Sequence, residues 1–553
     1  MNLPAILHDS LIDACPLDGR MHLRLRTARG DFAAVRVHYS CNKYEWWQRR
    51  ETTYMRLAFT DSGFDYFAVE IPLTDTRFAY IFELEPVYGQ HLWLSEEGVS
   101  PLCDFSLSYF NFFQYTSMFP QDLAAVPAWV RGVTGYQIFP ERFDRGLPAS
   151  EKGYVTSAWT DLPAPKSFFG GDLEGIRRRL PYLQRLGVGL LYLTPVFVSP
   201  SNHKYDTVDY EHVDPHFGGD EALRALIRDA HAAGMRVMLD GVFNHCSSSH
   251  PFFLDAMERG SASPYFDWFF IDTDKGGRPT GYRTFAAVRS MPKLNTAHPA
   301  VIDYFCRVAR MWMREYGADA WRLDVSDEIS HRFLRAFRES VTAENPDTLI
   351  IGEDWHNPRR SLCGDEYDSL MNYAFTKACL DLFAFETITP RDFCDRLIRL
   401  YHRTNIAVAR KQYNLLDSHD TDRFLTRVGG DRRRHRAALA LLFFYPGIPF
   451  VYYGDEIGLE GGYDPDCRRT FCWEEGKQDS GTLELVRYLA GLRRRPALSR
   501  GTFAIDERDG IVTLTRTAPA ERISLTVNCG HSEKDGLWPY EIHITEHKGG
   551  TRK

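Results

Sequence analysis

Between about residues 132 and 456, short apolar runs alternate with longer amphipathic stretches, and no other feature constrains the fold as strongly. Such alternation of strand-like and helix-like segments favours a parallel β-sheet covered by helices. The strand-like runs are GVTGYQIF, GVGLLYLTPVF, MRVMLDGVF, ADAWRLDV, TLIIGEDW, SLMNYAF, QYNLLDSHD and IPFVYYGDE. In most of these runs Asp, Glu, His or Arg appears near the C-terminal end of the strand, at the place where barrels of eight parallel strands carry their active sites. We therefore predict an α/β fold built on a (β/α)8 TIM-type barrel.

The chain has 553 residues, whereas single hydrophobic cores stop growing beyond roughly 250 to 300 residues. Residues 1–125 carry runs such as MHLRLRT and DYFAVEIPL, which predict an N-terminal β-sandwich domain. The segment FPQDLAAVPAWVRG then predicts a linker into the catalytic barrel, residues 126–495. Residues 496–553 return to strand patterning, and we expect a small C-terminal β-domain there.

The third and fourth predicted strands are separated by about seventy residues, too many for one helix and its loops. This stretch contains PYFDWFF and MPKLN. We expect an insertion after the third strand that lies above the mouth of the barrel.

Charge and cysteine content bound the partners and the compartment. The formal net charge of −8 gives no basic surface for nucleic acid, and no segment is apolar enough to span a bilayer. The N-terminal stretch carries Asp9 and Asp13 and does not resemble a secretory signal. The eleven cysteines are scattered singly, which favours free thiols in a reducing compartment. We expect a cytoplasmic protein with no nucleic-acid or membrane partner.

Four polar clusters follow predicted strands: DGVFNH (240–245), RLDVSDE (322–328), EDWH (353–356) and DSHDTD (417–422). Breaking an acetal requires a proton donor for the leaving oxygen and a carboxylate at the oxocarbenium-like carbon. Carboxyl groups from neighbouring strand ends suit this reaction. A buried Asp beside an Arg is often only a structural ion pair, and for Arg322 and Asp324 in isolation that alternative stays open.

Together these motifs resemble the α-amylase family, and within it the cyclomaltodextrinase, neopullulanase and maltogenic amylase branch. The resemblance covers most of the chain and rests on the four clusters in their order. It also rests on MPKLN before the second cluster, on SNHKYDTVDY after the second strand and on PGIPFVYYGDEIGLEGGYDPDCRR near the eighth.

The resemblance implies a retaining glycoside hydrolase with three catalytic acids. Asp324 would be the nucleophile, held ionised by Arg322, and Glu353 the general acid and base. Asp420 would bind hydroxyl groups of the distorted glucose. Retention predicts that the carboxyl groups of Asp324 and Glu353 lie about 5 to 5.5 Å apart.

The resemblance also implies a set of substrate-binding residues. Tyr205 would stack on the glucose at the cleavage site, and His245 and His419 would act on the same sugar as neutral donors. Asp240 would support the surroundings of Arg322 and Tyr205. The remaining positions are Asp464 and Arg468 on the non-reducing side, and Trp355 and Glu328 on the acceptor side.

Two departures from the family pattern bear on specificity and metal binding. The branch carries Asn-Glu after the nucleophile strand, whereas this chain has Asp327-Glu328. Relatives often bind calcium through a run of Asn and Asp together with the glycine and aspartate of FGGD. Here FGGD is present as 169–172, but the loop FDRGLPASEKGY offers little beyond Asp144, and calcium takes about six or more oxygen ligands. We therefore predict no metal site and no required cofactor, with calcium only weakly supported.

The resemblance implies α-1,4-glucan substrates, namely cyclomaltodextrins, pullulan and maltooligosaccharides or starch, with transglycosylation as a side reaction. It further implies a homodimer whose N-terminal domains roof the active sites. An α-glucosidase or a 4-α-glucanotransferase would use the same acids and stays open. A non-catalytic glucan-binding protein is disfavoured, because all three acids are present.

Overall fold

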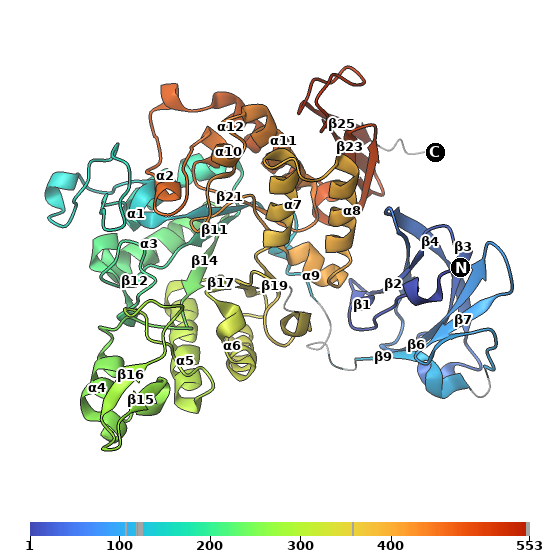
Figure 1. The fold of residues 1–553 in the computed structure, drawn as a ribbon, viewed down its shortest axis with the longest axis horizontal. Helices are drawn as coiled ribbons and strands as arrows, with labels where there is room; N and C mark the ends of the chain where they lie inside the picture. The colour runs from blue at the N-terminus through green and yellow to red at the C-terminus, as the bar shows by residue number, and fades with distance from the viewer. Residues whose placement is uncertain (106–107, 118, 120–124, 357–358, 549–553) are drawn as a thin grey trace.

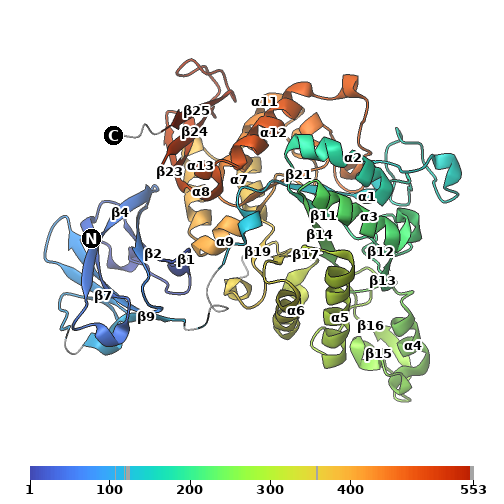
Figure 2. The same ribbon diagram turned by 180° about the vertical axis from the view of Figure 1, so that it is seen from behind.

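The computed structural model describes residues 1–553 except 106–107, 118, 120–124, 357–358 and 549–553, and has three parts (Figures 1 and 2). An N-terminal β-sandwich lies beside the central barrel, next to helices α8 and α9, and a small C-terminal sheet packs near α8 and α11. The predicted fold class is confirmed. No helix in the described part of the chain combines the length and apolarity needed to cross a membrane.

The N-terminal part is a folded sheet with one core between its layers. Strand β4 pairs with β5 on one side and β3 on the other, so that the two layers are continuous. Leu23, Val35 and Phe82 are fully buried in the core between them. Its strands are β1 (Ala14–Leu17), β2 (Arg20–Ala28), β3 (Phe32–Ser40), β4 (Glu51–Thr60), β5 (Phe64–Pro72), β6 (Arg77–Pro86), β7 (Leu92–Ser95), β8 (Gly98–Ser100) and β9 (Phe113–Thr116).

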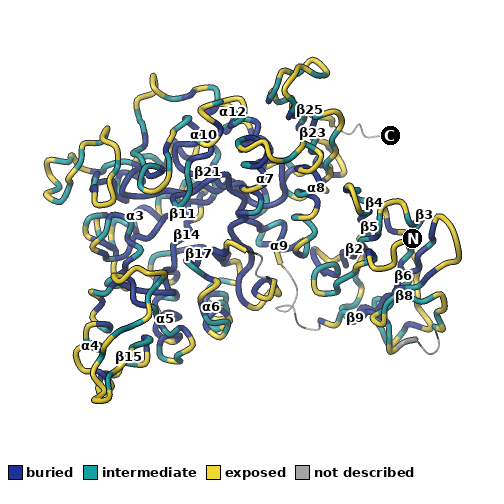
Figure 3. Tube along the Cα trace, in the orientation of Figure 1, coloured by how far each residue is buried: buried dark blue, intermediate teal, exposed yellow. Residues whose placement is uncertain are grey.

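The central part is a closed barrel of parallel strands, and each of the eight predicted runs supplies one strand. The order around the barrel is β19-β18-β17-β14-β11-β10-β21-β20, and a parallel bridge between Met371 and Tyr413 joins its two ends. The strands are β10 (Gly135–Ile138), β11 (Leu190–Leu193), β14 (Arg236–Gly241), β17 (Ala320–Leu323), β18 (Leu349–Gly352), β19 (Ser369–Leu370), β20 (Tyr413–Asn414) and β21 (Ile448–Tyr452). Every residue of these strands is buried except Arg236, the first residue of β14, and Figure 3 shows the largely buried trace through β11, β14, β17 and β21.

Helices cover the barrel, and local sequence explains where they begin and end. Helix α5 begins after His298, whose side chain accepts from the amide of Ala300, and ends at Gly317, whose φ of 84° suits glycine. The helices are α1 (Pro140–Phe143), α2 (Leu173–Leu186), α3 (Gly219–Ala232), α4 (Pro251–Arg259), α5 (Pro299–Tyr316), α6 (His331–Glu344), α7 (Tyr373–Phe383), α8 (Pro390–Tyr401), α9 (Ile406–Lys411), α10 (Phe424–Arg427), α11 (Arg432–Phe444), α12 (Ser480–Arg493) and α13 (Pro496–Arg500).

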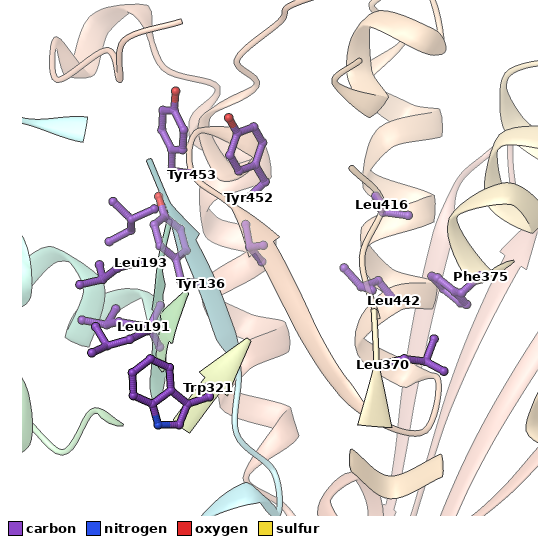
Figure 4. Close-up of a cluster of buried hydrophobic side chains, with 14 of the residues drawn as sticks. Tyr136, Leu191, Leu193, Trp321, Leu370, Phe375, Leu416, Leu442, Tyr452 and Tyr453 are labelled. Atoms are coloured by element: carbon purple, nitrogen blue, oxygen red, sulfur yellow. The ribbon is translucent and has the colours of Figure 1, made fainter. Parts of the chain in front are cut away.

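Residues alternate along each barrel strand between two separate cores. Leu191 and Trp321 belong to the large core shared with the helices, part of which Figure 4 shows. Tyr192 and Ala320 belong to a second core inside the barrel. Since side chains two residues apart point to the same face, Arg322 continues the inward row that begins at Ala320. This alternation aims the polar strand ends into the barrel mouth.

The predicted insertion after the third strand is present and contains α4 and a hairpin of β15 (Ile271–Thr273) and β16 (Pro279–Tyr282). Bridges from His245 to Lys293 and from Phe269 to Leu294 fasten it near the end of β14. The short antiparallel pair β12 (Phe197–Val198) and β13 (Asp209–Val213) follows β11.

The C-terminal part is an antiparallel sheet of β22 (Thr502–Arg508), β23 (Ile511–Ala518), β24 (Glu521–Asn528) and β25 (Ile542–Lys548). The proposed boundary near residue 495 lies between α12 and α13, and the one near 125 follows residues 120–124. The predicted linker over 119–132 therefore lies in part outside the described residues, and both domain boundaries stay predictions.

Candidate active site

One buried guanidinium organises the carboxyl ends of three neighbouring strands. Nη1 of Arg322 donates to both oxygens of Asp240, at 2.9 and 3.0 Å, and to Oδ1 of Asp324 at 2.8 Å. Its other terminal nitrogen, Nη2, lies 2.7 Å from Oε2 of Glu353. Arg322 has no exposed surface, and Asp324 and Glu353 are each 5% exposed. The predicted nucleophile and the predicted acid therefore flank the same cation.

The backbone after the predicted nucleophile adopts an uncommon conformation. Val325 has φ 47° and ψ 47°, in the left-handed region that β-branched residues rarely occupy. Its amide donates to Oε2 of Glu353 at 3.0 Å, and the amide of Ser326 donates to the Glu353 carbonyl at 3.1 Å. Strained backbone of this kind clusters at functional sites. Here the turn aims a hydrogen-bond donor at the second carboxylate.

Burial changes the titration of both carboxyl groups. Desolvation raises the pKa of Glu353, and Asp420 adds to the rise while Arg322 opposes it. Desolvation also raises the pKa of Asp324 well above its usual range, against the attraction of Arg322. The Glu353 carboxylate adds to the rise in the pKa of Asp324, so the two groups titrate as a coupled pair.

A chain of hydrogen bonds runs from the predicted sugar-binding residues to Asp240. Tyr192 donates to Oδ2 of Asp240 at 2.6 Å, and the Tyr205 hydroxyl lies 3.0 Å from the same oxygen. That hydroxyl also lies 2.6 Å from Nε2 of His419, with the two rings parallel at 1°. The amide nitrogen of Gln137 lies 2.7 Å from the other ring nitrogen of His419. Since an amide NH2 group only donates, Nε2 of His419 carries the ring proton.

Asp420 links His419 to the residues predicted for the non-reducing side. Its carboxylate lies 3.1 Å from Nε2 of His419 and accepts from Nη2 of Arg468 at 3.3 Å. Asp464 lies 2.8 Å from Nη1 of the same arginine. The Asp420 side chain is 30% exposed and that of Asp324 is 7% exposed, so Asp420 is the more open of the two to a ligand.

Burial keeps both predicted histidines neutral. Desolvation lowers the pKa of His245 to about 3, and it lowers the pKa of His419 well below its ordinary value. His245 stacks on Phe285 of the insertion, and its Nε2 has no hydrogen-bond partner among the described residues. An unpaired buried donor or acceptor of this kind is suited to a ligand group.

The predicted acceptor-side residues lie at the rim of this site. Trp355 is 58% exposed and stacks on Tyr373 with ring centroids 3.8 Å apart. Glu328 forms an ion pair with Lys293 at 2.7 Å. Lys293 belongs to MPKLN, a motif that indicated the family but had been given no role. Gln137 and Tyr192 were also missed, although both occupy inward positions of predicted strands.

Two groups of residues bear on metal binding. Ligand atoms of Asp327, Asp354 and His356 lie within 4.8 Å of one another. His356 and Asp354 are already paired at 2.8 Å, and Tyr367 donates to Asp354 at 2.8 Å. Because His356 and Asp354 already have partners within the protein, we assign no metal to this cluster.

The residues that relatives would use for calcium do not fit a cation here. The ammonium group of Lys152 contacts the carboxylate of Asp172 and donates to the carbonyl of Gly170 at 2.8 Å. Asp172 also accepts from the amides of Gly146 and Gly175, at 2.9 and 2.7 Å. The Lys152 side chain therefore supplies positive charge to the Gly170 carbonyl and the Asp172 carboxylate. No step of the chemistry is assigned to a metal.

Known proteins match this chain in sequence and in fold. Residues 137–487 match the family described as alpha amylase, catalytic domain, and residues 1–118 match the alpha amylase, N-terminal ig-like domain. A cyclomaltodextrinase from Geobacillus thermopakistaniensis is 42% identical over 524 residues, which cover 92% of this chain and 87% of the relative. Neopullulanase 2 from Thermoactinomyces vulgaris is 40% identical over 540 residues, covering 96% and 91%. A solved cyclomaltodextrinase structure superposes with a TM-score of 0.88 at 38% identity, covering 96% of this chain and 91% of the other.

Proposed function

The chain belongs to the α-amylase family of glycoside hydrolases, and from this premise we propose that it cleaves α-1,4-glucosidic links with retention. The proposal rests on a single arrangement, in which Arg322 contacts both Asp324 and Glu353. In the same site, the carboxylate of Asp420 lies 3.1 Å from Nε2 of His419. Two carboxyl groups beside one bond are what retaining glycosidases require.

In the first step Asp324 attacks the anomeric carbon of the glucose. Glu353 gives its proton to the glycosidic oxygen, the carbon–oxygen bond breaks, and a glycosyl ester of Asp324 forms. Burial raises the pKa of both carboxyl groups, and the step proceeds from the form in which Glu353 holds a proton and Asp324 is ionised. Arg322 stabilises the Asp324 carboxylate without touching the sugar.

In the second step the ionised Glu353 takes a proton from water, whose oxygen attacks the same carbon. The ester bond breaks, Asp324 leaves as a carboxylate, and the product keeps the α configuration. A sugar hydroxyl in place of water gives transglycosylation. Glu328 and Trp355 line the side from which the acceptor enters, so they set the balance between the two outcomes.

We assign the remaining contacts to the sugar at the cleavage point. Asp420 accepts from ring hydroxyl groups, with bonds that strengthen in the transition state. His245 and His419 contribute neutral ring nitrogens, Tyr205 supplies a stacking face, and the pair of Asp464 and Arg468 holds the next glucose. Neutral histidines avoid placing a cation beside the developing oxocarbenium ion.

The names of the relatives support cyclomaltodextrins and pullulan as substrates, and we add maltooligosaccharides and starch as further α-glucan substrates. We further propose a homodimer, as the resemblance to this branch implies, in which the N-terminal domain that residues 1–118 match roofs the active site of a second copy. The eleven free cysteines of the chain support a reducing, cytoplasmic compartment.

Product chromatography from β-cyclodextrin, pullulan and soluble starch tests the proposal. We expect rapid opening of the cyclodextrin, with maltose as the main product and panose from pullulan. Asp324→Asn should abolish turnover of all three, whereas Asp303→Asn, an exposed acid on α5, should leave it unchanged. Glucose as the sole product would indicate an α-glucosidase, and longer chains a 4-α-glucanotransferase. Absence of turnover by the unmodified chain would contradict hydrolysis altogether.

A further inference from the structure

A cavity of about 390 Å³ lies where the three parts of the molecule meet. Its walls include β2 and β5 of the N-terminal sheet, the segment before β10, the turn before β21 and the start of β22. Gly132 and Gly447 place it at the amino-terminal ends of barrel strands. The catalytic acids lie at the carboxyl ends, so this cavity is separate from the candidate active site.

The lining is strongly basic in a chain whose net charge is −8. Seven arginines line the cavity, and Glu70 is the one acidic residue among them. Three of the seven, Arg24, Arg131 and Arg410, pair with Asp13 or Asp18 outside the cavity. The other four form no ion pair with any described carboxylate, and their positive charge is unbalanced by the protein itself.

Two of those four arginines are fully enclosed. Arg493 and Arg516 are 3% and 4% exposed. Arg493 donates only to carbonyls, those of Phe443, Leu498 and Gly447 at 2.6 to 3.3 Å. Arg516 likewise donates to the carbonyls of Phe444, Leu498 and Gly501 at 3.0 to 3.2 Å.

These carbonyl contacts leave the two guanidinium groups incompletely satisfied. The Nε atoms of Arg493 and Arg516 have no partner within the described structure. Desolvation lowers the pKa of Arg493 to about 9 and that of Arg516 to about 10, and Arg516 adds to the effect on Arg493. A buried charge without a counter-ion is strongly unfavourable. An anion in the adjoining cavity would relieve this penalty for both residues.

The other two unpaired arginines are exposed and free to close on a ligand. Arg56 extends from β4 and Arg500 ends α13, so they approach the cavity from different parts of the chain. Arginine matches phosphate oxygens through paired donors of fixed geometry. The cavity volume falls within the range of small-molecule sites. Phe59, Tyr401 and Phe503 supply apolar faces beside the arginines.

We propose that this cavity binds a phosphate group, carried either by inorganic phosphate or by a phosphorylated monosaccharide. The anion would neutralise Arg493 and Arg516 from within and be held by Arg56 and Arg500 from outside. Because these residues come from the sandwich, the barrel helices and the C-terminal segment, binding would fasten the three parts together and stabilise the folded chain.

Calorimetric titration and thermal unfolding of the full chain test this, with sodium phosphate, glucose 6-phosphate and glucose as ligands at constant ionic strength. We expect saturable binding and a rise in Tm with sodium phosphate and with glucose 6-phosphate. Glucose should neither bind nor raise the Tm. Arg56→Gln combined with Arg500→Gln should weaken binding about tenfold or more, since two charge-assisted contacts are lost. Arg332→Gln plus Arg20→Gln removes the same charge from exposed positions that do not line the cavity and should leave affinity unchanged.

The arms of the experiment separate the two sources of phosphate. Equal affinity for both compounds would mean that the phosphate group alone is recognised, and tighter binding of glucose 6-phosphate would mean that the sugar is held as well. A rise in Tm no larger than that given by sodium chloride would overturn the proposal. So would phosphate binding that survives the Arg56 and Arg500 double change. None of these readouts depends on glycosidase activity.

Discussion

Nη1 of Arg322 binds Oδ1 of Asp324 at 2.8 Å while the same nitrogen holds both oxygens of Asp240. The guanidinium thus fixes the carboxylate that we propose as the nucleophile relative to a second, fully buried one. Its remaining nitrogen contacts Glu353 at 2.7 Å. One planar cation sets the mutual positions of three carboxylates, which a point charge could not do.

Arg322→Lys keeps the positive charge but loses this fork. We expect kcat to fall by about a thousandfold, comparable to removal of a preorganised donor from a catalytic site. The free energy of unfolding should also fall by roughly 3 kcal/mol, because buried carboxylates lose hydrogen-bond partners. Steady-state kinetics with thermal unfolding measures both effects. Arg332→Lys, on the exposed face of α6, is the matched control. A kcat within tenfold of the original would contradict the role given to the fork.

The Tyr205 hydroxyl bridges His419 and Asp240. Tyr205→Phe keeps the ring for stacking and removes the bridge. We expect kcat/KM to fall by about tenfold, the value of one or two lost hydrogen bonds. Tyr488→Phe removes a hydroxyl that contacts Glu546 on the far surface and should change nothing in kinetics. Equal kinetics in both variants would show that the bridge has no part in positioning His419.

Much of the fold followed from local pattern. All eight predicted strands are present, including β19, which is only two residues long but lies between two buried residues, Asp368 and Met371. Inward aim of Asp240, Arg322 and Asp324 could also be predicted, because residues two apart share a strand face. These side chains meet at one mouth of the barrel. Once the strands are predicted correctly, the grouping of these residues follows.

Other features left no signal in the sequence. Val325 gives no sign of a left-handed conformation, since its β-branched side chain disfavours it. Lys152 contacts Asp172 from a loop, and the sequence of this loop has no hydrophobic periodicity from which its path could be predicted. Arg493 and Arg516 line one cavity from the two sides of the predicted boundary near residue 495, and only the tertiary structure reveals that neither forms an ion pair with a described carboxylate.

The contact of Lys152 with Asp172 predicts independence from calcium. Chelation with EDTA should change neither the Tm nor the activity of the unmodified chain. Lys152→Met should lower the free energy of unfolding by about 3 kcal/mol, because a buried carboxylate loses its cation. Lys477→Met removes an exposed partner of Glu474 and should have little effect. Loss of stability on chelation, restored by calcium alone, would contradict this assignment.

The last prediction concerns the pH dependence of kcat/KM. Turnover needs one proton shared by Asp324 and Glu353. As pH falls, the second proton neutralises Asp324 and ends attack; as pH rises, the last proton leaves and Glu353 can no longer act as an acid. Burial raises the pKa of both groups, so both limbs should lie above the ordinary carboxyl values of about 4.

Histidine would be the usual explanation for a limb near neutrality, but the site argues against it. The pKa of His245 is lowered to about 3 and that of His419 lies well below its ordinary value. A water-miscible organic solvent separates the two cases, because a less polar medium raises the pKa of a carboxylic acid and lowers that of an imidazolium. We expect both limbs of the profile to move to higher pH in the mixed solvent. A limb that moves to lower pH would place its titration on a histidine, and the shared proton of Asp324 and Glu353 would then not be what sets the rate.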